Sequence, residues 1–375
     1  MYDNISRTAV IGLRSINLRA LLRYVFIVAL IIPYISYRLE VIKNYIIPTY
    51  GNTMYHVGIE RLITQTGFYP TEELSYNGGF HHFYVPSYRL FVSSFSLITT
   101  TDPMVTSGMV MIIISLAIFG IIYAITKRTL NPFAGVCALF LLIISPEMTI
   151  FSIRALPELL GLFMFPLTLY FILLNNTSKQ CSLNAYSYLS ILAASITALT
   201  HQMTLLTLAF VLVIYGLTQL KNRAELLNAW IPLAAAITVY GAWQFYSLHT
   251  LNILGLAQVK FHEGMPVDLF ASTYKVGFIE RTGLLLVGFC ILGIVYLEYK
   301  KTDKRFLLYA WIGASLILTK NDLFGINIFM DRFLTFMVEG MIIVGGIGAY
   351  ATLKFLDRYV LDIIFHKTQN APVKK

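Results

Sequence analysis

Long apolar runs recur along the sequence of 375 residues and constrain its fold more than any other feature. A bilayer core about 30 Å thick needs roughly 17–25 mostly apolar residues per helix. Backbone groups in lipid must be bonded internally, and the runs are too long for barrel strands, so they predict helices. We expect an all-α, polytopic transmembrane bundle of about ten spans, at 20–37, 103–126, 131–146, 156–174, 184–200, 202–220, 227–247, 281–299, 304–319 and 333–354.

Composition supports a lipid environment. Hydrophobic residues make up 57% of the chain and charged residues 13%, with a mean hydropathy of +0.70, whereas soluble domains carry about 25% charged residues. The net charge of +9 comes mainly from short loops between the apolar runs, which is an orientation signal. We therefore expect the lipid bilayer, and no nucleic acid, as a partner.

The distribution of Lys and Arg predicts the orientation of the chain. Most of the 28 basic residues fall on one side, together with both chain ends. The positive-inside rule then places the protein in the cell membrane with its N- and C-termini in the cytoplasm. We treat 1–375 as a single integral membrane domain with long outward segments at 38–102, 248–280 and 320–332 and a cytoplasmic tail at 355–375.

The first outward segment carries the densest polar pattern. Its sequence predicts two helices, at 53–67 and 86–99, the second apolar enough to lie in the membrane interface. Asn52, His56 and Glu60 would share one face of the first helix at i, i+4 and i+8 spacing. Such a stripe could bind a metal ion, a phosphate or a sugar hydroxyl, or it could be the wet face of an ordinary amphipathic helix.

Two histidine motifs are candidates for substrate contacts. His82 and Tyr84 lie in an aromatic cluster, 80–89, that could stack on a sugar or a polyprenyl chain, or form an interfacial belt. His201 lies in a tight outward turn, where a histidine is either a ligand or a satisfied structural residue.

Ionisable residues at the outer span ends form a further group of candidates. Glu158 follows Pro157 in the first turn of a predicted span, where it could act chemically or simply interact with the helix dipole. Arg154, Lys320 and Arg332 are outward cations, and an arginine fork matches phosphate oxygens. Alternatively, Arg332 pairs with a nearby aspartate or a lipid headgroup.

The order of these features resembles the GT-C superfamily of membrane glycosyltransferases. The resemblance rests on the Asn52 to His56 pattern, the Tyr84 to Pro86 segment, the entrance 154–158, the turn at 200–204 and the late 332–334 motif. That superfamily includes protein O-mannosyltransferases, aminoarabinose transferases and oligosaccharyltransferases. The resemblance implies transfer of a sugar from a polyprenyl-phosphate carrier to an acceptor glycan, lipid or protein on the outer face, with a divalent metal ion as a candidate cofactor.

One position departs from the family pattern. The family carries an acidic residue in the first outward loop, but Asn52 stands there, and an amide cannot take up a proton at neutral pH. Either Glu60 or Glu158 is then the base, or the chain binds without catalysing. We favour Glu158, because its flanking leucines favour a carboxyl group that takes up a proton near neutral pH, and we expect Glu60 on a wetter face as a stronger acid. Asn52, His56 and Glu60 would then position the acceptor or the metal.

Other multispan functions stay open at this stage. A transporter or flippase for lipid-linked solutes would need ionisable residues at mid-span, and Glu339 is the best such feature. A glycan polymerase would depend on arginines rather than on carboxylates.

The orientation can be tested with an impermeant thiol reagent on sealed cells. We predict that single cysteines at Gly67 and Lys275 are labelled from outside and that one at Lys301 is not, because the basic cluster around residues 300–305 is costly to translocate. Labelling at position 301 from outside would overturn the topology.

Overall fold

Helices account for almost all regular structure in the chain. The computed structural model describes residues 18–44, 51–70, 72–73, 80–81, 84–175, 184–250, 278–325 and 330–361. The helices are α2 (Leu18–Asn44), α3 (Gly51–Thr66), α4 (Ser87–Thr99), α5 (Pro103–Thr129), α6 (Pro132–Ile144), α7 (Pro146–Ser152), α8 (Pro157–Asn175), α9 (Ala185–Ala198), α10 (Gln202–Thr218), α11 (Arg223–Thr250), α13 (Phe278–Thr282), α14 (Leu284–Lys300), α15 (Arg305–Thr319) and α16 (Met330–Phe355). A short ribbon pairs β1 (Glu72–Glu73) with β2 (Phe80–His81), η2 spans Asn321–Phe324, and η3 spans Leu356–Leu361.

The predicted helical membrane fold is confirmed. Each predicted span coincides with a helix, and five helices, α2, α5, α8, α11 and α16, are long and apolar enough to cross a membrane. A sixth span results if α6 and α7, which meet at a bend of 73°, are counted together. Because α9, α10 and α15 are shorter, the count of about ten spans stays a prediction.

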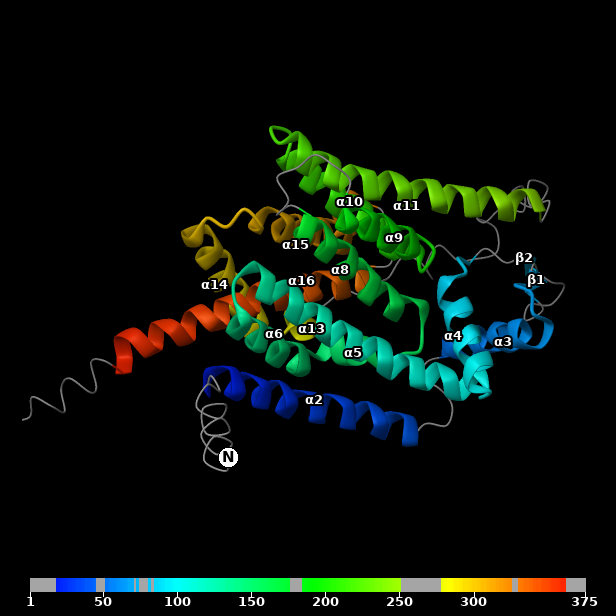
Figure 1. The fold of residues 1–375 in the computed structure, drawn as a ribbon, viewed down its shortest axis with the longest axis horizontal. Helices are drawn as coiled ribbons and strands as arrows, with labels where there is room; N and C mark the ends of the chain where they lie inside the picture. Colours follow the sequence, from blue (N-terminus) through cyan, green and yellow to red (C-terminus); the bar gives the residue numbers. More distant parts are fainter. Residues whose placement is uncertain are drawn as a thin grey trace, which may run out of the picture.

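Helix α16 forms the core of the bundle, and α2 lies at its edge (Figure 1). In α16, 89% of the most apolar window is buried, against 11% in α2, so α2 presents most of its surface to the surroundings. The indole of Trp311 in α15, itself fully buried, donates a hydrogen bond to the carbonyl oxygen of Phe336 in α16, at 2.8 Å. Satisfying the polar atom of a large buried ring in this way fixes α15 against α16.

Glycines let α16 approach its neighbours backbone to backbone. A Cβ atom on Gly348 would overlap the carbonyl oxygen of Phe289 in α14, and one on Gly346 would overlap the backbone of Ala138 in α6. In the same contact between α14 and α16, a Cβ on Gly293 of α14 would overlap the carbonyl oxygen of Val344 in α16. Small residues are the usual device for close helix packing in lipid, and here they determine the position of α16.

The first outward segment folds as predicted, with small shifts in its boundaries. Helices α3 and α4 match the two predicted helices, whereas α2 continues to Asn44, seven residues beyond the expected end of the first span. Arg38 therefore lies within α2, buried, where it donates to the carbonyl oxygen of Tyr34 at 2.7 Å and also bonds Ser152. Most of the predicted outward segment 248–280 and most of the predicted tail 355–375 lie outside the described residues.

The two ends of the described bundle differ in character. Helix α2 begins and α16 ends at one end, and α3, α4 and the β-ribbon gather at the opposite end (Figure 1). The backbone N–H of Ser87, at the start of α4, donates to the carbonyl oxygen of Leu199 at 2.9 Å. This bond attaches the first outward segment to the turn between α9 and α10.

Close packing of α14 on α16 predicts a position-specific cost of enlarging a glycine. Gly293→Ala should destabilise the protein by about 1–3 kcal/mol, because the clash is with backbone that cannot move aside. Gly288→Ala is the matched control on the same helix, since nothing lies within 4 Å of its added Cβ and alanine favours helix. Thermal unfolding in detergent should show a lower Tm for the first variant alone; equal Tm values would contradict this packing.

Candidate functional site

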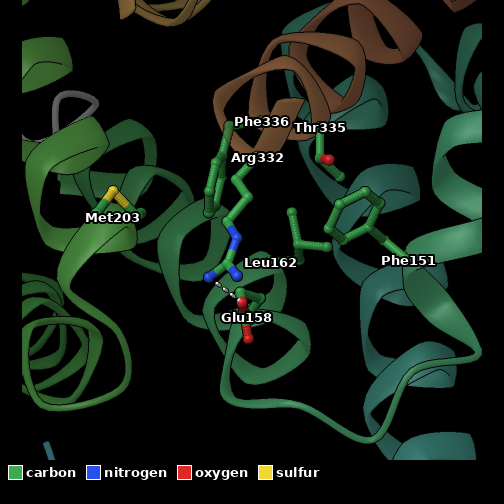
Figure 2. Close-up of a pocket in the computed structure, with 7 residues that line it drawn as sticks. All are labelled: Phe151, Glu158, Leu162, Met203, Arg332, Thr335 and Phe336. Carbon is green, nitrogen blue, oxygen red and sulfur yellow. Dashed lines mark hydrogen bonds and ion pairs between the residues drawn. The ribbon is translucent and has the colours of Figure 1, made fainter. Parts of the chain in front are cut away.

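An ion pair joins the N-terminal ends of two helices that lie far apart in the sequence. Pro157 opens α8, which places Glu158 in the first turn, and Arg332 lies near the start of α16. Arg332 Nη1 donates to Glu158 Oε1 at 2.6 Å, and the two side chains point toward one another (Figure 2). Arg332 therefore pairs with Glu158, a partner that the sequence did not indicate.

His201 completes this group from a third element. Its Nε2 lies 3.6 Å from Glu158 Oε1, and it precedes α10 as the N-cap residue. The side chains of Glu158 and His201 are 10% and 9% exposed, and that of Arg332 is 23% exposed. A carboxylate this buried requires a nearby cation. Arg332 is the most accessible of the three residues, so an anionic ligand could contact its guanidinium.

A tight crevice, too narrow in this structure for a water molecule, adjoins the pair (Figure 2). It is lined by Phe151, Glu158, Leu162, Met203, Arg332, Thr335 and Phe336. Ligand pockets usually measure about 300–1,000 Å³. A phosphate or an apolar chain could therefore enter the crevice only if the lining side chains moved apart.

A second carboxylate–arginine pair lies beside the crevice and was missed at the sequence level. Ser145 caps α7 by accepting from the backbone N–H of Met148, and Glu147 follows in the first turn, fully buried. Arg281 of α13 donates to both its oxygens, at 2.9 and 3.0 Å, and Thr335 donates at 2.8 Å. Glu147 stands out in the sequence after Ser145 and Pro146, but its partner, 134 residues away, leaves no local signal.

The polar stripe on α3 is present, but its members do not share one environment. Asn52 is exposed, whereas His56 and Glu60 are buried. His56 Nδ1 accepts a hydrogen bond from Arg89 Nε at 3.1 Å. Arg89, a fully buried residue that sequence reasoning overlooked, also donates to the hydroxyl of Tyr69 at 3.0 Å.

The expectation that Glu60 is a wet, stronger acid is wrong. Glu60 has no exposed surface, and burial raises its pKa to about 8, although a hydrogen bond from Ser107 at 2.9 Å and the charge of Arg89 oppose the shift. Helix α3 packs against α4 and α5, which covers the face that the sequence pattern left open. Glu60 is therefore a mainly neutral carboxyl group at pH 7.

Asn52, His56 and Glu60 do not form a metal site as they stand. One nitrogen of His56 already faces a guanidinium, Glu60 is neutral and bonded to Ser107, and Asn52 is an exposed amide. Hard divalent cations need ionised oxygen ligands. Within the described ranges, no three His, Cys, Asp or Glu side chains converge on one point.

The remaining predicted residues lie at varying distances from the pair. Tyr84 is 43% exposed and its ring packs near His56. Arg154 lies over the ring of Phe151, within electrostatic range of Glu158. Lys320 bonds Asp322 at 2.9 Å, and His82 lies outside the described residues.

Glu339 is buried in the middle of α16. It has no exposed surface, and neither of its carboxyl oxygens has a hydrogen-bond partner among the residues that the structure describes. It lies one helical turn beyond Thr335, away from the crevice.

Comparison with known proteins identifies the fold but no sequence family. No family model matches the chain, and no curated protein matches its sequence. Solved structures do match. ArnT from Cupriavidus metallidurans, bound to undecaprenyl phosphate, aligns with a TM-score of 0.62 at 12% identity, over 88% of this chain and 60% of that one.

An archaeal enzyme gives a second match. The oligosaccharyltransferase AglB from Archaeoglobus fulgidus, in complex with an inhibitory peptide and a dolichol-phosphate, aligns with a TM-score of 0.56 at 16% identity, over 85% of this chain and 48% of that one. Its complex with Zn and sulfate aligns with a TM-score of 0.54 at 17% identity, over 85% and 47%. The chain thus spans about half to three-fifths of the length of these proteins. The chain has the fold of these ArnT and AglB structures, as the resemblance implied.

Proposed function

We propose that the chain is a membrane glycosyltransferase that moves a sugar from a polyprenyl-phosphate carrier to an acceptor on the outer face of the membrane. The observation that carries the proposal is the Glu158–Arg332 pair beside a crevice between α8 and α16, in a chain with the GT-C fold. The ArnT and AglB structures contain undecaprenyl phosphate and dolichol-phosphate, which supports a carrier of the same chemistry here.

Arg332 binds the phosphate of the carrier in this proposal. Its guanidinium is the more accessible member of the pair, and its fork geometry matches two phosphate oxygens. Leu162, Met203 and Phe336 line the adjoining crevice and offer apolar contacts to the start of the polyprenyl chain. Arg154 is a second cation within electrostatic range of Glu158. Lys320, the C-cap residue of α15, is a third candidate for binding the phosphate.

Glu158 is the proposed general base. When the phosphate takes the guanidinium of Arg332, the carboxylate loses its cation and can accept the proton of the acceptor hydroxyl. The acceptor oxygen forms a bond to the anomeric carbon while the bond from that carbon to the phosphate oxygen breaks. The electron pair leaves with the phosphate, whose charge Arg332 stabilises.

The first outward segment would position the acceptor. Asn52 at the exposed start of α3 and the half-exposed ring of Tyr84 offer an amide and a stacking face. His82 remains a predicted substrate contact outside the described residues. His56 orients this region through Arg89. We assign no divalent ion to these residues, because their arrangement does not fit a metal site.

Replacing Arg332 tests the carrier site. Both Arg332→Lys and Arg332→Ala should weaken binding of undecaprenyl phosphate by about 10- to 100-fold, because a point charge cannot replace a two-pronged hydrogen-bond donor. Arg61→Lys is the matched control, since Arg61 pairs with Asp102 through two hydrogen bonds at an exposed position. If donor affinity and turnover are unchanged in both Arg332 variants, the phosphate binds elsewhere, with Arg154 and Lys320 as the next candidates.

Replacing Glu158 tests the base. Glu158→Gln should lower turnover by about 10²- to 10⁴-fold while leaving carrier binding intact, because the amide cannot accept the proton. Glu60→Gln should have a smaller effect, since Glu60 is already neutral at pH 7. The assay uses purified protein in lipid with polyprenyl-phosphate sugars.

Two results would contradict this function. Turnover insensitive to Glu158→Gln would remove the base assignment. Absence of turnover with every donor, even after Asn52→Asp restores an acid in the first outward segment, would favour a protein that binds lipid-linked sugars without catalysis.

A further inference from the structure

Buried polar atoms without partners lie on residues around Tyr88 and Glu158. Three such atoms are the hydroxyl of Tyr88, Nδ1 of His201 and Oε1 of Glu60, none of which has a hydrogen-bond partner within the described part of the chain. The three residues are 1%, 7% and 0% exposed. About 90% of buried polar groups in proteins are hydrogen-bonded, so three exceptions in one region indicate a partner beyond the described part of the chain.

These atoms come from separate elements that converge on one region. The bond between Ser87 and Leu199 brings the start of α4 against the turn that carries His201. The ring of Tyr88 lies edge-on to His56 at 6.3 Å, and both Glu60 and Glu158 are within electrostatic range of its hydroxyl. Tyr88 therefore lies between α3 and the Glu158 pair.

The chemistry of the group indicates what the partner must offer. Burial raises the pKa of Tyr88 well above its usual value of 10.0, so its hydroxyl remains a hydrogen-bond donor. Glu60 is a neutral carboxyl that can donate or accept, and His201 Nδ1 can do either, depending on its tautomer. A ligand with several hydroxyl groups would satisfy all three, because each hydroxyl both donates and accepts.

We propose that Tyr88, together with Glu60 and His201, binds the sugar of the lipid-linked donor. This inference rests on the proposed glycosyltransferase function and adds the residues that recognise the transferred group. The carboxylate of Glu158 borders this region and disfavours an anion, whereas Glu60 is neutral at pH 7. The phosphate instead belongs beside Arg332, in the crevice that neither Tyr88 nor Glu60 lines.

The test compares binding of three lipids to the full-length protein in nanodiscs. Undecaprenyl phosphate carries no sugar, whereas undecaprenyl-phosphate-glucose and undecaprenyl-phosphate-mannose do. Tyr88→Phe should weaken binding of the sugar-bearing lipid that the wild type prefers by about 5- to 10-fold, the effect of one hydrogen bond, and leave undecaprenyl phosphate binding unchanged. In turnover, KM for the donor should rise with little change in kcat.

Tyr309→Phe is the matched control. It also removes one tyrosine hydroxyl, but that hydroxyl donates to the carbonyl oxygen of Ile294 at 3.3 Å, away from the site. It should change the affinity of neither lipid. Tyr88→Phe should unfold at a Tm no lower than that of the wild type, because no intramolecular hydrogen bond is lost.

The outcomes separate this proposal from the proposed function. Equal effects of Tyr88→Phe on lipids with and without sugar, no effect on either, or a wild type that binds all three lipids equally would overturn the role of Tyr88. A Tyr88-dependent preference for a sugar-bearing lipid without any turnover would support the sugar site and contradict the enzyme. Normal turnover and donor KM in Tyr88→Phe would retain the enzyme and reject the sugar site.

Discussion

The position of α16 is the constraint on which the outer site depends. Glycines on α16 and α14 allow the two backbones into direct contact, and a further glycine admits the backbone of α6. In lipid, apolar surfaces gain little by burying against one another, so helix position comes from close packing and from bonds between polar groups. Because Arg332 and Thr335 belong to the first turns of the same helix, the packing near its middle determines where both side chains lie.

Two buried carboxylates, each paired with an arginine, lie near the start of α16. Glu158 meets Arg332, and Glu147 meets Arg281 and Thr335, so α16 touches both networks. Removing one member of a buried pair leaves an uncompensated charge, which costs far more than the intact pair contributes. An anionic ligand can replace a carboxylate as the partner of an arginine, so the guanidinium is never left unpaired. Arg332 is suited to such an exchange because it is more accessible than Glu158.

The first outward segment has a different electrostatic design. Its acidic position holds an amide, Asn52, and its nearest carboxyl, Glu60, is neutralised by burial. The positive charge of Arg89 lies among tyrosine rings and His56, within electrostatic range of the neutral Glu60. Cations gain from the faces of aromatic rings when water is excluded, so this segment offers neutral donors and acceptors, while the ionic chemistry is concentrated at Glu158 and Arg332.

The sequence alone determined the helical membrane fold, the places of the helices and the resemblance to GT-C proteins, because apolar run length and proline or glycine positions act locally. It also singled out Glu158, Arg332 and His201, since ionisable residues at span ends are conspicuous against an apolar background. Only the tertiary structure decided their pairing, the burial of Glu60 and the Glu147–Arg281 contact. Those features join residues separated by up to 174 positions and depend on which helix faces pack together, and no periodicity within a single segment encodes that choice.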